Sequence, residues 1–185
     1  VGSHRPDLQS GTYCLVNAVL AASGCETELV HLRGRRIQGC TGCLGCVRDN
    51  VCVVDDDLRP LRDQLVAADA YVIGAPNVYG GMNATTHAFL ERWFQFRHRE
   101  GRLLWGKLAV AVGVGGVSGA PAIKDIERFL AANYIETIAR VHARGTASCF
   151  TCGFGATCKV SIAYLLRADG FSVPAEKIKV IYNGC

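Results

Sequence analysis

The sequence predicts one α/β domain, a three-layer sandwich in which helices cover both faces of a mostly parallel sheet. The chain has 185 residues, half of them hydrophobic, which suits a single domain with a full core. Segments with strand and helix patterns alternate along it, as in parallel α/β folds. Residues 70–75 and 108–114 are short and continuously apolar, which is typical of strands buried on both faces.

The elements follow in order from the periodicity of the chain. Residues 11–23 predict an apolar helix that ends at Gly24, and residues 26–32 alternate like a half-buried strand. Asp57 is placed to cap the next helix. The remaining expected elements are helix 58–68, strand 70–75, loop 76–82, helix 83–98, strand 108–114, helix 120–132 and strand 134–143.

Composition narrows the function classes. The net charge is +4, from 20 basic and 16 acidic residues, which is too small an excess to indicate nucleic-acid binding. Charges interrupt every apolar stretch, so no membrane span is expected. A large core and no visible signal peptide favour ligation over disulfide bridging for the ten cysteines. We therefore expect a single cytoplasmic domain over residues 1–185, with a cysteine-rich insertion at 40–52.

Ligands of parallel sheets bind beyond the carboxyl ends of the strands, here at loops 3–12, 76–82 and 113–119. The first loop has two readings: an anion site of backbone N–H groups and hydroxyls, or a polar turn with a Ser/Thr helix cap. Loop 113–119 is a poor dinucleotide fingerprint, because Ser118 stands where the last glycine belongs. Its glycines better suit a backbone lying flat against a planar ring.

Four cysteines form the most specific motif. Cys40, Cys43, Cys46 and Cys52 follow a C-x2-C-x2-C-x5-C pattern. Three closely spaced thiolates and a fourth can wrap an iron–sulfur cluster, and Gly42 and Gly45 let the backbone curl around it. Zinc binding and unligated thiols are the alternatives. A second group, Cys149, Cys152 and Cys158, is a weaker signal. It is better explained as a glycine-rich turn with ordinary thiols, such as a redox pair at Cys149 and Cys152. The alternative is a second cluster or metal site with Cys185 as a possible fourth ligand.

Other polar residues have simpler explanations. The basic run Arg92, Arg97, His98, Arg99 and Arg102 predicts a solvated face, or alternatively a docking patch for an acidic electron carrier. The acidic run of residues 55–57 is explained by helix capping and dipole compensation. Aromatic residues of helix 83–98, such as Trp93, are expected in the core or at a subunit contact.

The loop sequences then point to a family. GSHR followed by SGT, APNVYGGM followed by a helix with AFLERW, and a glycine-rich loop after the next strand resemble the NADPH-dependent FMN reductase branch of the flavodoxin-like superfamily. The resemblance implies FMN. The implied phosphate-binding residues are Ser3, Arg5, Ser10, Gly11, Thr12 and Tyr13. The implied ring-binding residues are Pro76, Asn77, Val78, Tyr79, Gly80, Gly81 and Met82, with Gly115 and Gly116 on the other side of the ring.

The cysteine insertion narrows the resemblance to the iron–sulfur flavoproteins. It implies that Cys40, Cys43, Cys46 and Cys52 bind a [4Fe–4S] cluster at a subunit contact near FMN. The implied function is electron transfer between cluster and FMN in a homo-oligomer, a dimer or tetramer. The expected partners are a ferredoxin-like carrier or NAD(P)H and a small-molecule acceptor. No catalytic side chain is expected. The alternative is an NAD(P)H-dependent FMN or quinone reductase without a cluster.

The resemblance also carries an expectation for the sheet. A flavodoxin-like sheet has five parallel strands in the order 2-1-3-4-5, with strand one in the centre. Only Val1 and Gly2 precede the first loop, so nearly all of that strand is absent from the sequence. We expect further residues before Val1, and also after Cys185, where the closing helix of the family is missing.

Overall fold

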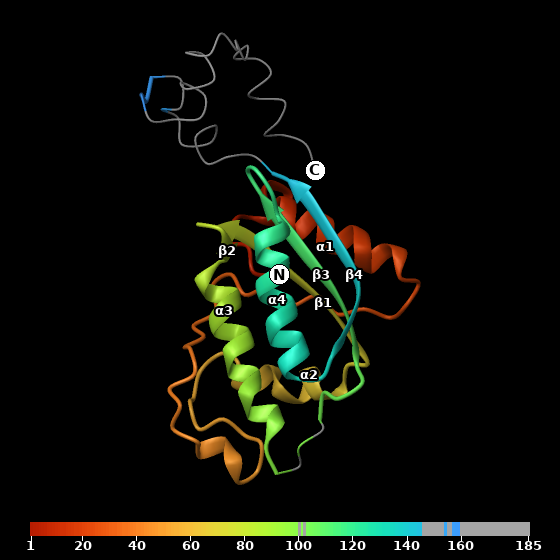
Figure 1. Cartoon of the computed structure of the whole chain (residues 1–185), viewed down its shortest axis with the longest axis vertical. Coiled ribbons are helices and arrows are strands. Elements are labelled where there is room, and N and C mark those ends of the chain that lie inside the picture. Colours follow the sequence, from red (N-terminus) through yellow and green to blue (C-terminus); the bar gives the residue numbers. More distant parts are fainter. Residues whose placement is uncertain (100, 102, 146–153, 155–156, 160–185) are drawn as a thin grey trace.

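The computed structural model describes residues 1–99, 101, 103–145, 154 and 157–159. Its sheet is the middle layer of a three-layer sandwich (Figure 1). The helices and 3-10 helices (η) are η1 (Asp7–Gln9), α1 (Gly11–Ala22), η2 (Gly45–Val47), η3 (Arg59–Leu61), α2 (Arg62–Ala67), α3 (Ala84–Glu91), η4 (Arg92–Arg97) and α4 (Ala120–Ala132). The strands are β1 (Ala70–Val78), β2 (Gly81–Met82), β3 (Leu108–Gly115) and β4 (Glu136–Arg144).

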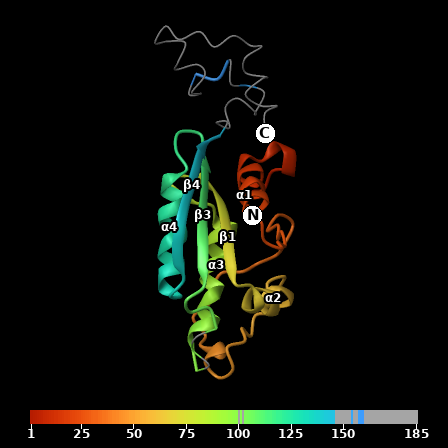
Figure 2. The ribbon, with the colours of Figure 1, turned by 90° about the vertical axis from the view of Figure 1, so that its right-hand side faces the viewer.

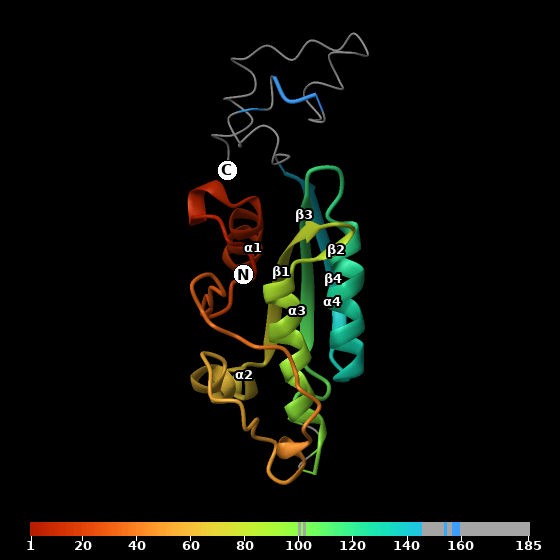
Figure 3. The same cartoon turned by 90° about the vertical axis from the view of Figure 1, so that its left-hand side faces the viewer.

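The sheet order is β2-β1-β3-β4. β1, β3 and β4 are parallel, and the register runs from Ala70 opposite Leu108 to Pro76 opposite Val114. α1 and α2 cover one face of the sheet, whereas α3 and α4 cover the other (Figures 2 and 3). This arrangement confirms the predicted α/β sandwich.

The prediction of five parallel strands is wrong for the described residues. They form a sheet of four strands, and the short β2 is antiparallel to β1. Residues 26–32 are also not a strand. Single hydrogen bonds still place Val1 and Gly2 in the expected central position. Leu32 N–H donates to the Val1 carbonyl (3.0 Å), and Gly2 N–H donates to the Gly74 carbonyl (2.8 Å). On the side of residues 26–32, Val1 alone of these two makes hydrogen bonds, to Val30 and Leu32. One residue cannot provide a ladder, which explains the missing strand.

Two predicted helices begin or end differently from the expectation. Helix 58–68 starts as η3 and continues as α2, and helix 83–98 changes from α3 to η4 at Arg92. Asp57 does not cap the first of these helices, because its carboxylate accepts the Arg36 N–H (2.6 Å). Asp56 accepts the Leu58 N–H instead (3.1 Å).

The main core joins the sheet to α3, η4 and α4, and it extends to Leu58, Leu61 and Leu65 at η3 and α2. Phe89, Trp93 and Phe96 are at most 5 % exposed and contact one another with their rings at steep angles. This confirms the aromatic stripe of helix 83–98 as core. It also makes α3 and η4 a firmly held element, which matters because the two candidate sites lie along it.

Candidate functional site

The three expected flavin loops meet at the carboxyl edge of the sheet. The Asn77 amide donates to the Ser118 carbonyl (2.7 Å), which joins the loop after β1 to the loop after β3. The Asn83 amide donates to the Gly2 carbonyl (2.8 Å), which joins the first loop to the start of α3. Segments far apart in sequence therefore form one surface, as the strand order predicted.

The first loop starts α1 with a serine cap. Ser10 Oγ accepts the Tyr13 N–H (3.1 Å), and Ser3 Oγ accepts the Arg5 N–H (3.2 Å). Ser3, Ser10 and Thr12 are each at most 5 % exposed, whereas Gly11 is exposed. The predicted helix cap is thus present, and it leaves a helix N-terminus facing the loop, which is favourable for a phosphate group.

The loop after β1 is a tight hairpin. Asn77 is paired with Met82 and Val78 with Gly81, so Tyr79 and Gly80 alone form the turn. Both turn residues have positive φ, 51° and 84°, as a type I′ turn requires. The Tyr79 side chain is fully exposed at the tip. The Met82 N–H donates to Asp125 on α4 (2.9 Å), which anchors the hairpin to the body of the domain.

One feature of these loops suits a ring with polar edges such as that of FMN. Asn77 Oδ1 is buried and has no hydrogen-bond partner within the described residues, so an acceptor is available there. Gly115 is required for the packing of the loop on itself, because a Cβ there would lie 2.2 Å from the Ser118 carbonyl oxygen. Gly116 beside it is exposed. The residues present therefore fit a flavin, which would bind at the loops expected from the sequence.

A cleft of about 500 Å³ extends from the hairpin along α3. Its lining residues are Val78, Met82, Asn83, Ala84, His87, Ala88 and Glu91. His87 is half-exposed and lies 3.5 Å from Glu91. The far end of the cleft reaches the cysteine segment, because Glu91 Oε2 accepts the Cys40 N–H (3.1 Å).

The cysteine segment, residues 40–52, curls at the end of α3–η4 that is remote from the hairpin (Figures 1 and 3). Gly42 has a φ of 66°, and a Cβ on Gly45 would lie 2.6 Å from a Val53 methyl group. Gly42 therefore has the conformational need that the sequence predicted, whereas Gly45 is constrained by the Val53 side chain and not by its backbone conformation. Leu44 also adopts a left-handed conformation, with a φ of 57°.

The four cysteines of the segment carry free thiols. Cys40 and Cys43 are exposed, Cys46 is buried and Cys52 is partly buried. Burial raises the pKa of Cys46, and the neighbouring thiols of Cys52, Cys40 and Cys43 raise it further. Four thiol groups in one short segment are donors that suit iron or zinc. In the part of the chain that is described, however, no three His, Cys, Asp or Glu side chains converge closely enough to hold a metal ion.

Most of the second cysteine group lies outside the described residues. Cys149, Cys152 and Cys185 lie outside the described residues, and Cys158 is a partly buried free thiol. A role for this group in metal binding stays a prediction.

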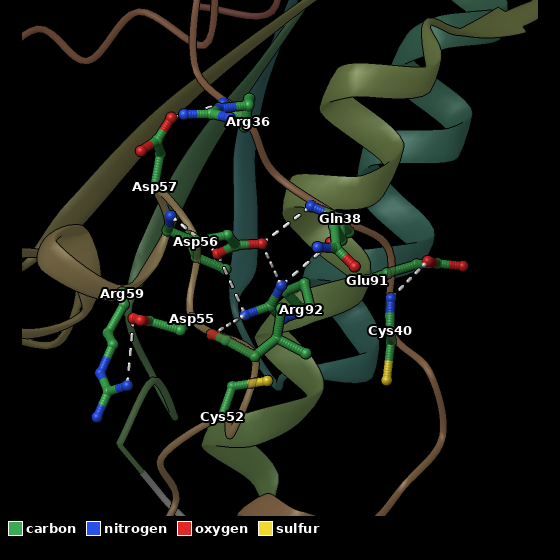
Figure 4. A network of polar contacts seen from close by, with 12 residues as sticks. Arg36, Gln38, Cys40, Cys52, Asp55, Asp56, Asp57, Arg59, Glu91 and Arg92 are labelled. Atoms are coloured by element: carbon green, nitrogen blue, oxygen red, sulfur yellow. Dashed lines mark hydrogen bonds and ion pairs between the residues drawn. The ribbon is translucent and has the colours of Figure 1, made fainter.

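A buried ion pair holds the cysteine segment to the domain (Figure 4). Arg92 Nη1 lies 2.7 Å from Asp56 Oδ2, and their side chains are 1 % and 4 % exposed. Arg92 also donates to the carbonyls of Gln38 (3.2 Å) and Val54 (3.3 Å), which flank the segment. The expected solvated basic face is therefore wrong for Arg92, although Arg97 and Arg99 are exposed. Arg102 lies outside the described residues.

The sequence contained a signal for this pair that we did not use. Arg92 lies on the same helical stripe as Phe89 and Phe96, at spacings of three and four, where a solvated charge does not belong. A buried arginine needs an acidic partner, and the run of residues 55–57 supplies one. Capping alone was an incomplete explanation of that run.

Comparison with known proteins shows the family. Residues 1–139 match the NADPH-dependent FMN reductases, and the chain belongs to that family. An iron–sulfur flavoprotein of Methanocaldococcus jannaschii is 30 % identical over 138 residues, which cover 69 % of this chain and 67 % of that protein. An iron–sulfur flavoprotein of Archaeoglobus fulgidus is 33 % identical over 99 residues, 52 % of this chain and 44 % of that protein.

A third relative, an iron–sulfur flavoprotein of Methanosarcina thermophila, is 30 % identical over 104 residues, 56 % of this chain and 54 % of that protein. The chain thus spans roughly half to two thirds of the length of these relatives.

Solved structures agree on the fold. RosB, crystallised with 8-demethyl-8-formylriboflavin-5′-phosphate, superposes with a TM-score of 0.59 at 17 % identity, over 79 % of this chain and 63 % of RosB. The Trp repressor binding protein of Bacillus subtilis superposes with a TM-score of 0.56 at 20 % identity, over 79 % of this chain and 84 % of that protein. Both support the flavodoxin-like sandwich. No described helix is long and apolar enough to cross a membrane.

Proposed function

We propose that this protein is an FMN-dependent oxidoreductase that passes electrons between FMN and a [4Fe–4S] cluster. The observation that carries the proposal is the path of α3–η4. Its start is joined to the flavin loops through Asn83, and its later residues Glu91 and Gln95 accept N–H groups from Cys40 and Cys52. One buried helical element thus connects the two candidate cofactor sites.

The cysteine ligands we propose are Cys40, Cys43, Cys46 and Cys52. A bound cluster would supply one-electron transfer and a bound flavin one- or two-electron transfer, so together they connect carriers of both kinds. The chain itself would orient the ring through Asn77 and provide the anion site at the start of α1. It holds both ends of the cysteine segment at fixed places on η4 and α3.

The separation of the two sites favours a homo-oligomer. From Ala84 to Gln95 the helical rise is roughly 18 Å, at about 1.5 Å per residue in α3 and 2.0 Å in η4. Cys40 and Cys43 are exposed at the remote end of this path. We propose that this end faces the flavin of another subunit in a dimer or tetramer.

The proposed electron transfer also implies external partners. A ferredoxin-like carrier would deliver single electrons to the exposed cysteines, and a small-molecule acceptor would use the cleft beside the hairpin. A reducing compartment would keep the four free thiols of the cysteine segment available for iron, so we propose a cytoplasmic location.

Anaerobic purification with iron, sulfide and flavin analysis tests the proposal. We expect about four iron atoms and one FMN per chain. Cys46→Ser should lose most of the iron and keep FMN, whereas Cys25→Ser, at an exposed thiol outside the segment, should keep both. Full flavin content without iron in the unaltered protein would rule the cluster out.

The family match supports one alternative, an NAD(P)H-dependent FMN or quinone reductase without a cluster. The dispersed thiols of the segment also agree with it. Rapid bleaching of the flavin by NADPH in iron-free protein would favour this alternative. Reduction by a ferredoxin, with slow bleaching by NADPH, would favour electron transfer through the cluster.

A further inference from the structure

We propose that the buried Arg92–Asp56 pair sets the reduction potential of the cluster held by the cysteine segment, acting through Cys52. This rests on the proposed function. Neither residue is a ligand; both are positioning residues whose charges lie beside the ligand loop.

The pair is more completely buried and more extensively bonded than any other ion pair of the described residues. Asp56 accepts hydrogen bonds from Arg92, from the Gln38 N–H (2.9 Å) and from the Leu58 N–H (3.1 Å). Both carboxylate oxygens are therefore occupied by donors. A carboxylate with this set of donors stays ionised at neutral pH, so the loop has one fixed negative and one fixed positive charge beneath it.

Arg92 is the member of the pair that lies against the ligand loop. Arg92 Nη2 donates to the carbonyl of Val54, two residues after Cys52 (3.3 Å), and Figure 4 shows the Cys52 side chain next to Arg92. Arg92 Nε is buried and has no hydrogen-bond partner among the described residues, so this N–H remains available to a sulfur. The next turn of η4 fixes the same cysteine, because the Cys52 N–H donates to Gln95 Oε1 (2.9 Å).

The geometry predicts opposite effects for the two charges. Reduction adds negative charge to the cluster, and a nearby cation in a site of low dielectric stabilises the reduced form. Removing the Arg92 charge leaves Asp56 alone, which should lower the potential. Removing the Asp56 charge leaves Arg92 uncompensated, which should raise it. A pair that served only to brace the loop would give no such opposition, since loosening the loop from either side has the same consequence.

The experiment is a redox titration of the anaerobically purified, cluster-loaded protein, monitored by electron paramagnetic resonance. The variants are Arg92→Gln, Arg92→Lys and Asp56→Asn. Arg97→Gln is the matched control, because Arg97 lies on the same 3-10 helix but is exposed. Iron and FMN contents are measured on every sample, so that a shifted potential is compared only between loaded proteins.

We expect Asp56→Asn to shift the oxidised-to-reduced equilibrium about tenfold toward reduction, about 59 mV for a one-electron couple. Arg92→Gln should shift it about tenfold toward oxidation, and Arg92→Lys less, since the charge remains but the planar fork is lost. Arg97→Gln should leave the equilibrium within about twofold of the unaltered protein, because solvent screens its charge.

Four results would overturn the proposal while leaving the proposed function intact. One is a shift of both charge-removing variants in the same direction. Another is a shift no larger than that of Arg97→Gln. If Arg92→Gln lost its iron, the reduction potential of Asp56→Asn would be the deciding measurement. An unchanged or lowered potential in that variant would contradict the proposal. Loss of iron from all three variants would show a folding brace instead. An iron-free unaltered protein would reject the proposed function itself.

Discussion

Asn83 lies where the first flavin loop meets the start of α3, and its side chain bonds in both directions. The amide donates to the Gly2 carbonyl, and Oδ1 accepts the Thr86 hydroxyl (2.7 Å). Both contacts are buried. A single side chain thus fixes the relative position of two segments separated by eighty residues of sequence.

Replacing Asn83 by alanine should therefore reduce the free energy of unfolding by about 1–3 kcal/mol, because two buried polar groups lose their partners. Urea denaturation followed by tryptophan fluorescence measures this change. The control is Thr85→Ala, two residues further along and less buried than Asn83. It should change the free energy of unfolding by less than about 0.5 kcal/mol. An equal effect of the two variants would contradict the assigned role of Asn83.

Asp56 provides a pH-dependent contribution at the same scale. Burial alone would raise the pKa of Asp56, but hydrogen bonds from Gln38, Arg92 and Leu58 outweigh burial and hold the pKa below its usual range. A carboxyl whose pKa is lower in the folded than in the unfolded state stabilises the fold above the unfolded value of about 3.9. That stabilisation is lost as the pH falls through the lower, folded pKa.

We expect Asp56→Asn to be roughly 3–5 kcal/mol less stable than the unaltered protein at pH 7, since it leaves a buried arginine without its charge partner. The gap should narrow as the pH falls below about 4. Urea denaturation at pH 7, 5, 4 and 3 gives both curves. Asp55→Asn, at an exposed carboxylate, should show no such narrowing. A gap that stays constant down to pH 3 would show that ionised Asp56 does not stabilise the fold.

At the scale of the element, the β1–β2 hairpin pairs a strained turn with an exposed aromatic ring. Tyr79 and Gly80 both have positive φ, a conformation that asparagine followed by glycine adopts most readily. Tyrosine is a poor choice there for stability. Its presence at the tip of the expected ring-binding loop agrees with a role in binding, where local strain is tolerated.

Tyr79→Asn should therefore raise the free energy of unfolding of the apoprotein by up to about 1 kcal/mol, because the turn becomes less strained. The same change should weaken FMN retention during gel filtration, because the exposed ring is lost. Gly80→Ala, which forces a Cβ into a φ of 84°, should lower the stability by about 1 kcal/mol. If the Tyr79→Asn protein retained FMN fully, Tyr79 would have no role in binding the flavin.

Much of the element scale was predictable from the sequence. Helix 120–132 has the predicted bounds, and strands 70–75 and 108–114 appear as β1 and β3, extended by a few residues. Their apolar runs and glycine-rich loops depend on local chemistry, which the sequence displays directly. Strand 26–32 was wrong because a strand depends on the neighbour it pairs with, and among the described residues Val1 alone bonds to it as a strand neighbour, through Val30 and Leu32.

At the scale of the whole molecule, the cysteine segment is an appendage of a core that is complete without it. Cys46 is buried, yet it is not a member of the main hydrophobic cluster that includes Trp93 and Ile126. Contacts from α3 and η4 hold the segment through its main chain. Unlike a zinc finger, this domain should not need its metal in order to fold.

Iron removal by an anaerobic chelator should consequently leave the far-ultraviolet circular dichroism within about 10 % of the loaded protein, because the sandwich core does not contain the segment. FMN should also remain bound. Limited proteolysis is expected to become faster within residues 40–52 only. Collapse of the circular dichroism signal on chelation would show that the metal site and the core fold as one unit.

The sequence by itself determined the sandwich, the order of its loops and the spacing of the four cysteines, because these depend on periodicity, turn chemistry and distance along the chain. Only the tertiary structure decided what lies beside what. It placed the cysteine segment at the far end of α3–η4 from the hairpin, buried Arg92 against Asp56 and brought Asn83 to Gly2. Those contacts join residues from 36 to 81 positions apart, so their energies depend on packing between distant segments. The apolar stripe around Arg92 indicates that its charge is buried, but it does not specify which carboxylate the charge meets.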